Sequence, residues 1–297
     1  MKMRAVSART WGGPEVLELI EVDRPSPIAT EILVRVHGAG VNPTDWKSRR
    51  SGAGYWQDPV ILGYDVSGVV EEVGLGVTLY QPGDEVFGMP WFPRQAGAYA
   101  EYVTAPARQF ARKPAGLSHV EAAALPLAAL TAWQSLIETG GLRTGDRVLI
   151  HAAAGGVGHL AVQIAKARGA YVIGTASAAK HDLVRRLGAD EVIDYRTVDF
   201  TEAVRDVDLV LDTVGGDYGP RSQRVLRPGG KLIRLTEPDE NFTLVEPDYA
   251  GLREIVALVE AGRLRPEVST VLPLASAAEA HTLSESGRTT GKIVLTV

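Results

Sequence analysis

The chain has 297 residues, of which 45% are hydrophobic and 23% are charged, and this length is enough for two ordinary cores. Its 31 basic and 36 acidic residues give a net charge of −5 with no long run of either sign, so nucleic acid and anionic membranes are not expected partners. Cysteine is absent, which excludes disulfides, thiolate nucleophiles and cysteine-ligated zinc, and fits a reducing compartment.

The first 115 residues have the pattern of short strands separated by turns. Strands are expected at residues 4–7, 32–41, 66–73, 85–88 and 99–103. Proline and glycine mark the turns between them, as in the Pro-Gly-Asp sequence at residues 82–84. This all-β pattern is typical of a small, partly open barrel.

From Val120 onward the pattern changes to alternating helices and strands. An apolar helix interrupted by Pro126 is expected over residues 122–138. Strands are then expected at residues 147–151, 171–175, 191–194, 208–212, 230–235 and 243–247. Six parallel strands would form the two halves of a doubly wound, Rossmann-type sheet, so the predicted fold class is α/β.

The last 50 residues predict a helix at 249–261, a strand at 268–272, a short helix at 275–285 and a strand at 292–297. We interpret this tail as returning to the first domain. The expected domains are residues 1–119 with 265–297, and residues 120–264.

The sequence RVLIHAAAGGVGHLAVQIAK at residues 147–166 predicts a buried strand, a glycine turn and an amphipathic helix. Such a turn lets free amides and the positive end of a helix approach a pyrophosphate. The residues expected to form this cradle are Ala154, Gly155, Gly156, Val157 and Gly158. The string AxxGxxG departs from the usual GxGxxG because Ala152 stands where the first glycine would be.

An NAD site would place Asp or Glu about twenty residues past the glycines, at the end of the second strand. Here the strand runs into Ser177, with Lys180 and His181 shortly after. These residues and Arg185 could neutralise a 2′-phosphate, which favours NADPH. The alternative is that Lys180 and Arg185 form the solvated face of a helix.

Nearly the whole chain resembles the zinc-free branch of the medium-chain dehydrogenase/reductase superfamily, the NADPH:quinone oxidoreductases related to zeta-crystallin. The resemblance rests on GVNPTDWKSR (40–49), PVILGYDVSGVVEEVG (59–74), GAYAEYV (97–103), AAALPLAALTAW (122–133), LGADEVIDY (187–195), DTVGG (212–216) and GKIVL (291–295), together with the glycine turn. It implies a GroES-like catalytic domain built by both chain ends, a Rossmann domain between them, and a homodimer.

The resemblance also extends the expected cofactor-binding residues. It adds Asn42, Lys47, Thr131, Tyr195, Leu235, Gly291 and Lys292, while the position of Thr213 and Val214 after the fourth strand adds that turn. For Lys47 the alternative is a surface lysine beside Arg49 and Arg50, and for Thr131 it is ordinary helix packing.

Zinc enzymes of this superfamily carry a cysteine after the Gly-Val pair and a His-Glu pair after the later glycine. This chain has Asn42 and Tyr64-Asp65 at those positions. An amide and a phenol replace the thiolate and imidazole that zinc prefers, so no metal is expected.

Hydride transfer from a nicotinamide requires the protein to orient the acceptor and supply a proton route. Asn42, Tyr55 and Tyr64 are the candidate catalytic residues, because an amide and phenols can bond to a carbonyl. A turn role for Asn42, loop capping by Tyr55 and core packing by Tyr64 remain alternatives. Tryptophans 46, 56 and 91 with Phe92 are expected to line an apolar slot, and residues 90–95 to gate it.

The sequence therefore predicts a cytoplasmic NADPH-dependent reductase of quinones or α,β-unsaturated carbonyl compounds. The amino terminus lacks the apolar core of a signal peptide, and no run of about 18 apolar residues occurs. The alternative function is an NADPH-binding redox sensor or sequestering protein with little turnover.

Overall fold

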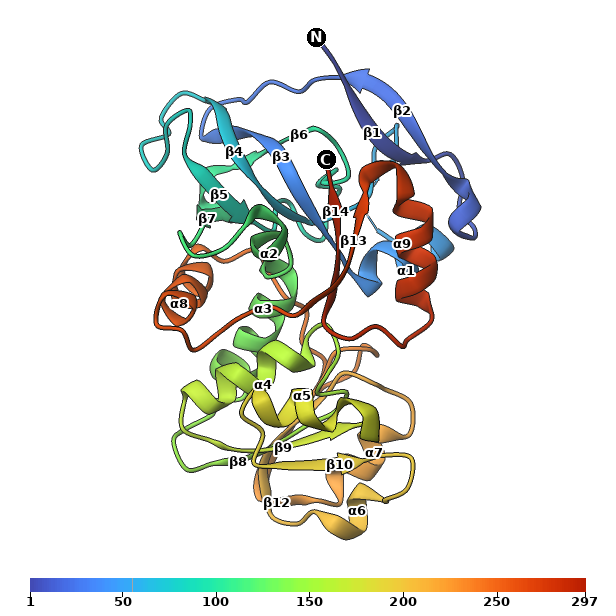
Figure 1. Cartoon of the computed structure of the whole chain (residues 1–297), viewed down its shortest axis with the longest axis vertical. Coiled ribbons are helices and arrows are strands. Elements are labelled where there is room, and N and C mark those ends of the chain that lie inside the picture. The colour runs from blue at the N-terminus through green and yellow to red at the C-terminus, as the bar shows by residue number, and fades with distance from the viewer. Residues whose placement is uncertain (55) are drawn as a thin grey trace. The chain divides into compact units, whose positions relative to one another are not determined.

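The computed structural model describes residues 1–54 and 56–297, which form two compact units (Figure 1). The first unit combines Met1–Ala128, Glu246–Glu260 and Pro266–Val297, so both ends of the chain contribute to it. The second comprises Ala129–Val245 and Ala261–Arg265. The domain limits expected from the sequence stay a prediction.

The first unit contains a two-stranded antiparallel ribbon and a larger sheet. Its strands are β1 (Lys2–Ala8), β2 (Leu17–Asp23), β3 (Glu31–Val41), β4 (Asp65–Val73), β5 (Glu85–Gly88), β6 (Tyr102–Pro106), β7 (Phe110–Arg112), β13 (Val268–Pro273) and β14 (Lys292–Thr296). Strands β1 and β2 form the ribbon. The larger sheet has the order β13-β14-β3-β4-β5-β7, and β6 also pairs with β3.

The helices of the first unit lie around this sheet in the sequence order α1 (Pro43–Ser51), α2 (His119–Ala123), the start of α3 (Pro126–Trp133), α8 (Tyr249–Glu260) and α9 (Ala277–Glu285). Short 3-10 turns occur at Pro14–Val16, Ala107–Gln109 and Leu274–Ser276. Helix α1 begins directly after β3, with Asn42 as its N-cap and Pro43 as its first residue. It ends at Gly52, whose φ of 72° is the left-handed conformation that favours glycine.

The centre of the first unit is β3, which is apolar along most of its length. Ile32 and Val34 pack with residues of β4 and β5 in one core cluster, and Ala39 and Val41 pack with β14 and α9 in another. The register places Gly40 opposite Asp65 and Val41 opposite Ile293. The fold therefore brings the end of β3 beside the starts of β4 and β14.

The second unit is a parallel sheet of order β10-β9-β8-β11-β12, which is the Rossmann order (Figure 1). Its elements are the rest of α3, a π-helical segment (Gln134–Thr139), β8 (Arg147–Ile150), α4 (Gly158–Ala167), β9 (Tyr171–Ala176), a 3-10 turn (Ala178–Lys180), α5 (His181–Arg186), β10 (Glu191–Asp194), α6 (Phe200–Ala203), β11 (Val207–Asp212), α7 (Tyr218–Gln223) and β12 (Leu226–Arg234).

The predicted α/β fold with a GroES-like unit and a Rossmann-type sheet is confirmed, but the expectation of six strands in that sheet is wrong. Residues 243–247 form no strand, and only an isolated parallel bridge joins Arg234 to Phe242. Val245 is buried but Leu244 is 54% exposed, and past the bond from the Thr243 amide to Arg234 the segment does not continue the hydrogen-bond ladder of β12.

Two other elements differ from expectation for local reasons. The strand expected at residues 99–103 begins instead at Tyr102, because the amides of Ala98 and Tyr99 bond to Gly63 and Leu62. The helix expected at residues 122–138 is divided into α2, α3 and the π-helical segment. Pro126 starts a new helix because it has no N–H to continue the first.

None of the helices within residues 1–54 and 56–297 combines the length and the apolar character that crossing a bilayer requires.

Candidate functional site

In the second unit, β8 leads into α4 through a tight turn at residues 151–157. Ala152 has a φ of 47°, a conformation that L-residues seldom adopt. In the described part of the chain, no acceptor bonds to the backbone amides of Ala154, Gly156, Val157 or Gly158. The turn is half-exposed at residues 155–157. It therefore offers a set of unpaired amides at a helix N-terminus, as an anion site requires.

Two glycines let this turn close on itself. A Cβ on Gly158 would lie 2.2 Å from the carbonyl oxygen of Ala152, which no side chain tolerates. At Gly155 the corresponding distance is 3.1 Å, so a methyl group there would need only a small adjustment. Of these two glycines, Gly158 is the one that the backbone strictly requires.

Lys180 ends the 3-10 turn that follows β9, the strand after which an NADH-binding protein would carry an acidic residue. Burial is the main cause that lowers the pKa of Lys180, and the nearby Arg196 lowers it further. The positive charge of Arg196 thus acts on Lys180, and Ser177 directly follows β9. Arg196 was missed from the sequence, because it follows a different strand, β10.

The other predicted residues of this cation group are placed differently. His181 lies within 3.3 Å of the carbonyl oxygen of Ala176, measured from its Nε2 atom. Arg185 pairs with Asp182 on the exposed face of α5, at 3.3 Å. Tyr195 is 46% exposed and lies against the guanidinium of Arg196, 5.7 Å from ring centroid to Cζ.

The turn after β11 lies at the same edge of the sheet. The Thr213 hydroxyl donates to the carbonyl of His151 at 2.9 Å, which connects this turn to the end of β8. The Asp212 carboxylate accepts from the amides of Val214 and Gly215, each at 2.9 Å. Val214 is 45% exposed. The amide of Leu235, just past β12, bonds to Asp212 at 3.1 Å.

In the first unit, the predicted residues Asn42 and Lys292 meet Asp65 where β3 ends and β4 and β14 begin. The Asn42 side-chain amide donates to Asp65 at 2.8 Å, and the Lys292 ammonium bonds to Asn42 Oδ1, to the Val41 carbonyl at 3.0 Å and to Asp65 at 3.3 Å. Asp65 also accepts from the Leu127 amide at 2.6 Å. Asn42, Asp65 and Lys292 are all buried. Burial raises the pKa of Asp65, although Lys292 opposes this.

A second group of buried polar residues continues from Asn42. The Asp45 carboxylate accepts from the Asn42 amide at 2.7 Å and from the Tyr99 hydroxyl at 2.9 Å. Its other oxygen has no partner among the described residues. Burial raises the pKa of Asp45 to about 7. Tyr99 also lies 3.3 Å from His281, and burial lowers the pKa of that imidazole to about 3.

Sequence reasoning missed Asp45, Tyr99 and Arg49. Arg49 is fully buried on α1 and pairs with Glu285 of α9. The available signal was the spacing of Asp45 and Arg49 four residues apart, which puts both on one face of a helix.

The remaining predicted residues occupy three kinds of environment. Tyr64 and Thr131 are buried, and Tyr64 contacts the rings of Trp56 and Phe92. Lys47 is exposed and lies over the Trp46 ring. Gly291 has a φ of 58°, and the amide of Lys292 is bonded to Glu267 at 2.8 Å. Tyr55 lies outside the described residues.

The donors at the positions where related enzymes bind zinc do not suit a zinc ion. Asn42 and Asp65 are bonded to each other and to the ammonium of Lys292. A dication placed there would face a fixed positive charge and an amide in place of a thiolate. Across residues 1–54 and 56–297, no three His, Cys, Asp or Glu side chains gather as a metal site would need.

Two family profiles match the chain. Residues 28–115 match the alcohol dehydrogenase GroES-like domain, and residues 187–295 match a family described as zinc-binding dehydrogenase. That second description differs from the donor set found here, in which Lys292 bonds to both Asn42 and Asp65.

Relatives cover almost the full chain. The zebrafish (Danio rerio) protein named NAD(P)H oxidoreductase RTN4IP1, mitochondrial, is 33% identical over 90% of this chain and 84% of its own length. The tomato (Solanum lycopersicum) 2-methylene-furan-3-one reductase is 35% identical over 99% of this chain and 79% of its own length.

A solved structure, the quinone oxidoreductase from Coxiella burnetii, matches with a TM-score of 0.93 and 37% identity, covering 100% of both chains. Sequence, fold and length therefore agree along the chain. The chain belongs to the quinone-oxidoreductase branch of the medium-chain dehydrogenase/reductase family.

Proposed function

We propose that this protein is an NADPH-dependent reductase of quinones or α,β-unsaturated carbonyl compounds that works without zinc. The observation that carries the proposal is the set of four unpaired backbone amides around Gly155–Gly158, at the amino end of α4. An anionic group with several oxygens, such as the pyrophosphate of a dinucleotide, would accept hydrogen bonds from these amides, which have no acceptor within the turn.

The preference for NADPH over NADH rests on the charges at the end of β9. Lys180 and Arg196 repel one another, and this repulsion contributes to the lowered pKa of Lys180. A 2′-phosphate between them would remove the repulsion, and the Ser177 hydroxyl would add a hydrogen bond. No carboxylate stands at residues 174–177 to hold the 2′-hydroxyl of NADH instead.

The absence of a zinc requirement rests on Lys292. Its ammonium already neutralises Asp65 and bonds to Asn42, so these groups have no need of a metal to be stable. The bound nicotinamide would supply the hydride, and the protein would hold the acceptor and exclude water.

The predicted roles of Asn42 and Tyr64 toward the acceptor remain part of this proposal. Both side chains are buried, and Asn42 uses its oxygen on Lys292 and one of its N–H groups on Asp65. Tyr64 is better placed, because its hydroxyl makes no hydrogen bond within residues 1–54 and 56–297, while burial raises its pKa and keeps it protonated as a donor.

NADPH oxidation by the purified protein tests the proposal. We expect turnover with a simple quinone, a simple enone or both, a kcat/KM for NADPH well above that for NADH, and full activity after dialysis against a chelator. Loss of activity on chelation would contradict the zinc-free mechanism. Tight NADPH binding with no oxidation across a varied acceptor panel would favour the sensor alternative.

The two acceptor classes are separated in the same assay. A comparison of kcat/KM between a benzoquinone and an acyclic enone of similar size shows which acceptor the site favours. A product analysis of the enone reaction then shows whether the double bond or the carbonyl is reduced.

A further inference from the structure

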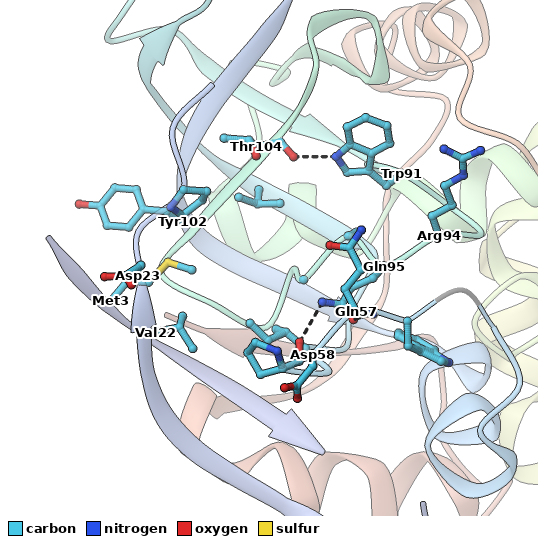
Figure 2. Close-up of a pocket in the computed structure, with 17 residues that line it drawn as sticks. Met3, Val22, Asp23, Gln57, Asp58, Trp91, Arg94, Gln95, Tyr102 and Thr104 are labelled. Atoms are coloured by element: carbon cyan, nitrogen blue, oxygen red, sulfur yellow. Dashed lines mark hydrogen bonds between the residues drawn. The ribbon is translucent and has the colours of Figure 1, made fainter. Parts of the chain in front are cut away.

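The first unit contains a cavity of about 830 Å³ between the β1–β2 ribbon and residues 91–97 (Figure 2). Apolar side chains of Met3, Val22, Ile61 and Val103 form part of its lining. Ligand cavities usually measure about 300–1,000 Å³, so this one has room for a drug-sized molecule. Nothing in the site described above uses this space.

Trp91 forms one wall and is held in a strained conformation. Its φ is 58°, which is unusual for a bulky residue and persists only where the surroundings impose it. Its backbone amide donates to Gln109 at 2.7 Å, and its indole N–H donates to the carbonyl of Thr104 at 2.8 Å (Figure 2). With its polar atom already bonded, the indole offers the cavity only its apolar surface.

The loop opposite the ribbon is fixed by one glutamine. Gln95 donates to the carbonyl of Pro59 at 3.0 Å and accepts from the amide of Gln57 at 3.2 Å (Figure 2). These bonds use the side-chain oxygen and one N–H of Gln95, so this side chain has only one N–H left to bond to a ligand in the cavity. Three lining residues are charged: Asp23, Asp58 and Arg94. Of these, Asp23 forms an ion pair with Lys2.

Aromatic rings connect this cavity to Tyr64, the residue expected to bond to the acceptor. Trp56 lines the cavity, and its ring centroid lies 6.5 Å from that of Tyr64. Phe92, next to Trp91, meets the Tyr64 ring edge-on at 4.9 Å. The cavity and the predicted acceptor position are therefore separated by a single layer of aromatic side chains.

We infer that this cavity binds an apolar substituent of the acceptor, such as an isoprenoid or alkyl chain, while the conjugated carbonyl group lies at Tyr64. This inference rests on the proposed function and narrows its substrate class to acceptors with a bulky, uncharged, lipophilic side chain. The fixed indole of Trp91 and the apolar residues across from it suit such a chain.

A series of benzoquinones with the same ring and zero, one or two isoprenoid units tests this inference. We expect kcat/KM to rise at least tenfold with the first unit, because full burial of a five-carbon apolar group would give a factor on the order of 1,000 and partial burial a smaller one. A quinone carrying an ether chain of equal length should gain far less, because its oxygens would lose hydration.

Two variants locate the effect. Trp91→Ala enlarges the cavity and Ala96→Phe fills it, and each should lower kcat/KM for the prenylated quinone several-fold more than for the unsubstituted one. Leu75→Ala, at an 85% exposed position away from the cavity, should leave the ratio unchanged. Ala96→Phe provides the test if Trp91→Ala does not fold.

The outcomes separate this inference from the proposed function. Equal kcat/KM for all chain lengths, or a chain-length preference that survives Ala96→Phe, would overturn the inference while the reductase function stands. Failure to reduce any quinone or enone, with or without a chain, would refute both.

Discussion

The glycine turn of the second unit and the buried polar network of the first unit differ in what they leave unsatisfied. The turn is built from backbone, and four of its amides have no partner among the residues that the structure describes. The network of Asn42, Asp65 and Lys292 is built from side chains that bond to one another away from solvent. A group with free bonding capacity is suited to a ligand, whereas a saturated one is suited to holding the fold.

This comparison predicts that changes in the network alter stability more than cofactor binding, and that changes in the turn do the opposite. The largest effect is expected for Asp65→Ala, which leaves the Lys292 ammonium buried without a carboxylate. We expect a loss of about 3–5 kcal/mol in the free energy of unfolding, measured with denaturant.

The exposed pair Lys2–Asp23, 3.0 Å apart, is the matched control. Asp23→Ala should cost less than about 1 kcal/mol, because solvent screens this pair. The double variant Asp65→Asn/Lys292→Met should recover part of the loss. If Asp65→Ala unfolds no more easily than Asp23→Ala, the network does not hold the fold.

Asp45 gives the network a pH signature. Its pKa rises from 3.8 to about 7 on folding, so between these values the folded state holds a proton that the unfolded state has lost. Stability should therefore fall as pH rises from about 4 to about 7 and then level off. Relative to Asp45→Asn, which cannot titrate, the native protein should lose up to about 4 kcal/mol over this range.

Denaturant unfolding of both proteins at pH 4.5 and pH 8 checks this, since the other titrating groups largely cancel in the difference. A difference that stays constant with pH would show that Asp45 is ionised in the folded protein.

For the turn, Gly158→Ala places a methyl group 2.2 Å from the Ala152 carbonyl and should displace the amides around it. We expect NADPH affinity to fall on the order of 100-fold, which corresponds to the loss of about two charge-assisted hydrogen bonds. Gly155→Ala is the matched control, because its methyl group would lie 3.1 Å from the Ala152 carbonyl oxygen. Its affinity for NADPH should be closer to that of the native protein.

A fluorescence titration with NADPH measures both variants, and thermal unfolding shows whether they are folded. Native affinity in a folded Gly158→Ala protein would exclude the turn as the pyrophosphate site.

The smallest effect is expected for Lys180→Met, which removes one cation at the end of β9. NADPH binding should weaken about tenfold and NADH binding hardly at all, because only NADPH carries the 2′-phosphate. Arg185→Met is the control, since Arg185 already pairs with Asp182. Equal losses for both cofactors would place Lys180 outside the phosphate site.

Periodicity and turn residues were enough to predict most elements of both sheets. Residues 85–88 and 191–194 were predicted with the same limits as β5 and β10, because a short buried run between turn residues has few alternatives. The segment at residues 243–247 was predicted wrongly, because its composition suits a strand although only an isolated bridge, at Phe242, joins this part of the chain to β12.

By itself the sequence determined the glycine turn and the presence of basic residues around Lys180. Both features are made by residues that follow one another along the chain, so they do not depend on long-range contacts. Only the tertiary structure decided that Arg49 is buried, that the charge of Arg196 acts on Lys180 and that Lys292 bonds to Asn42 and Asp65. Asn42 and Lys292 are 250 residues apart. Their contact exists because β14 pairs with β3 in one register, and strand pairing at that separation leaves no local trace in the sequence.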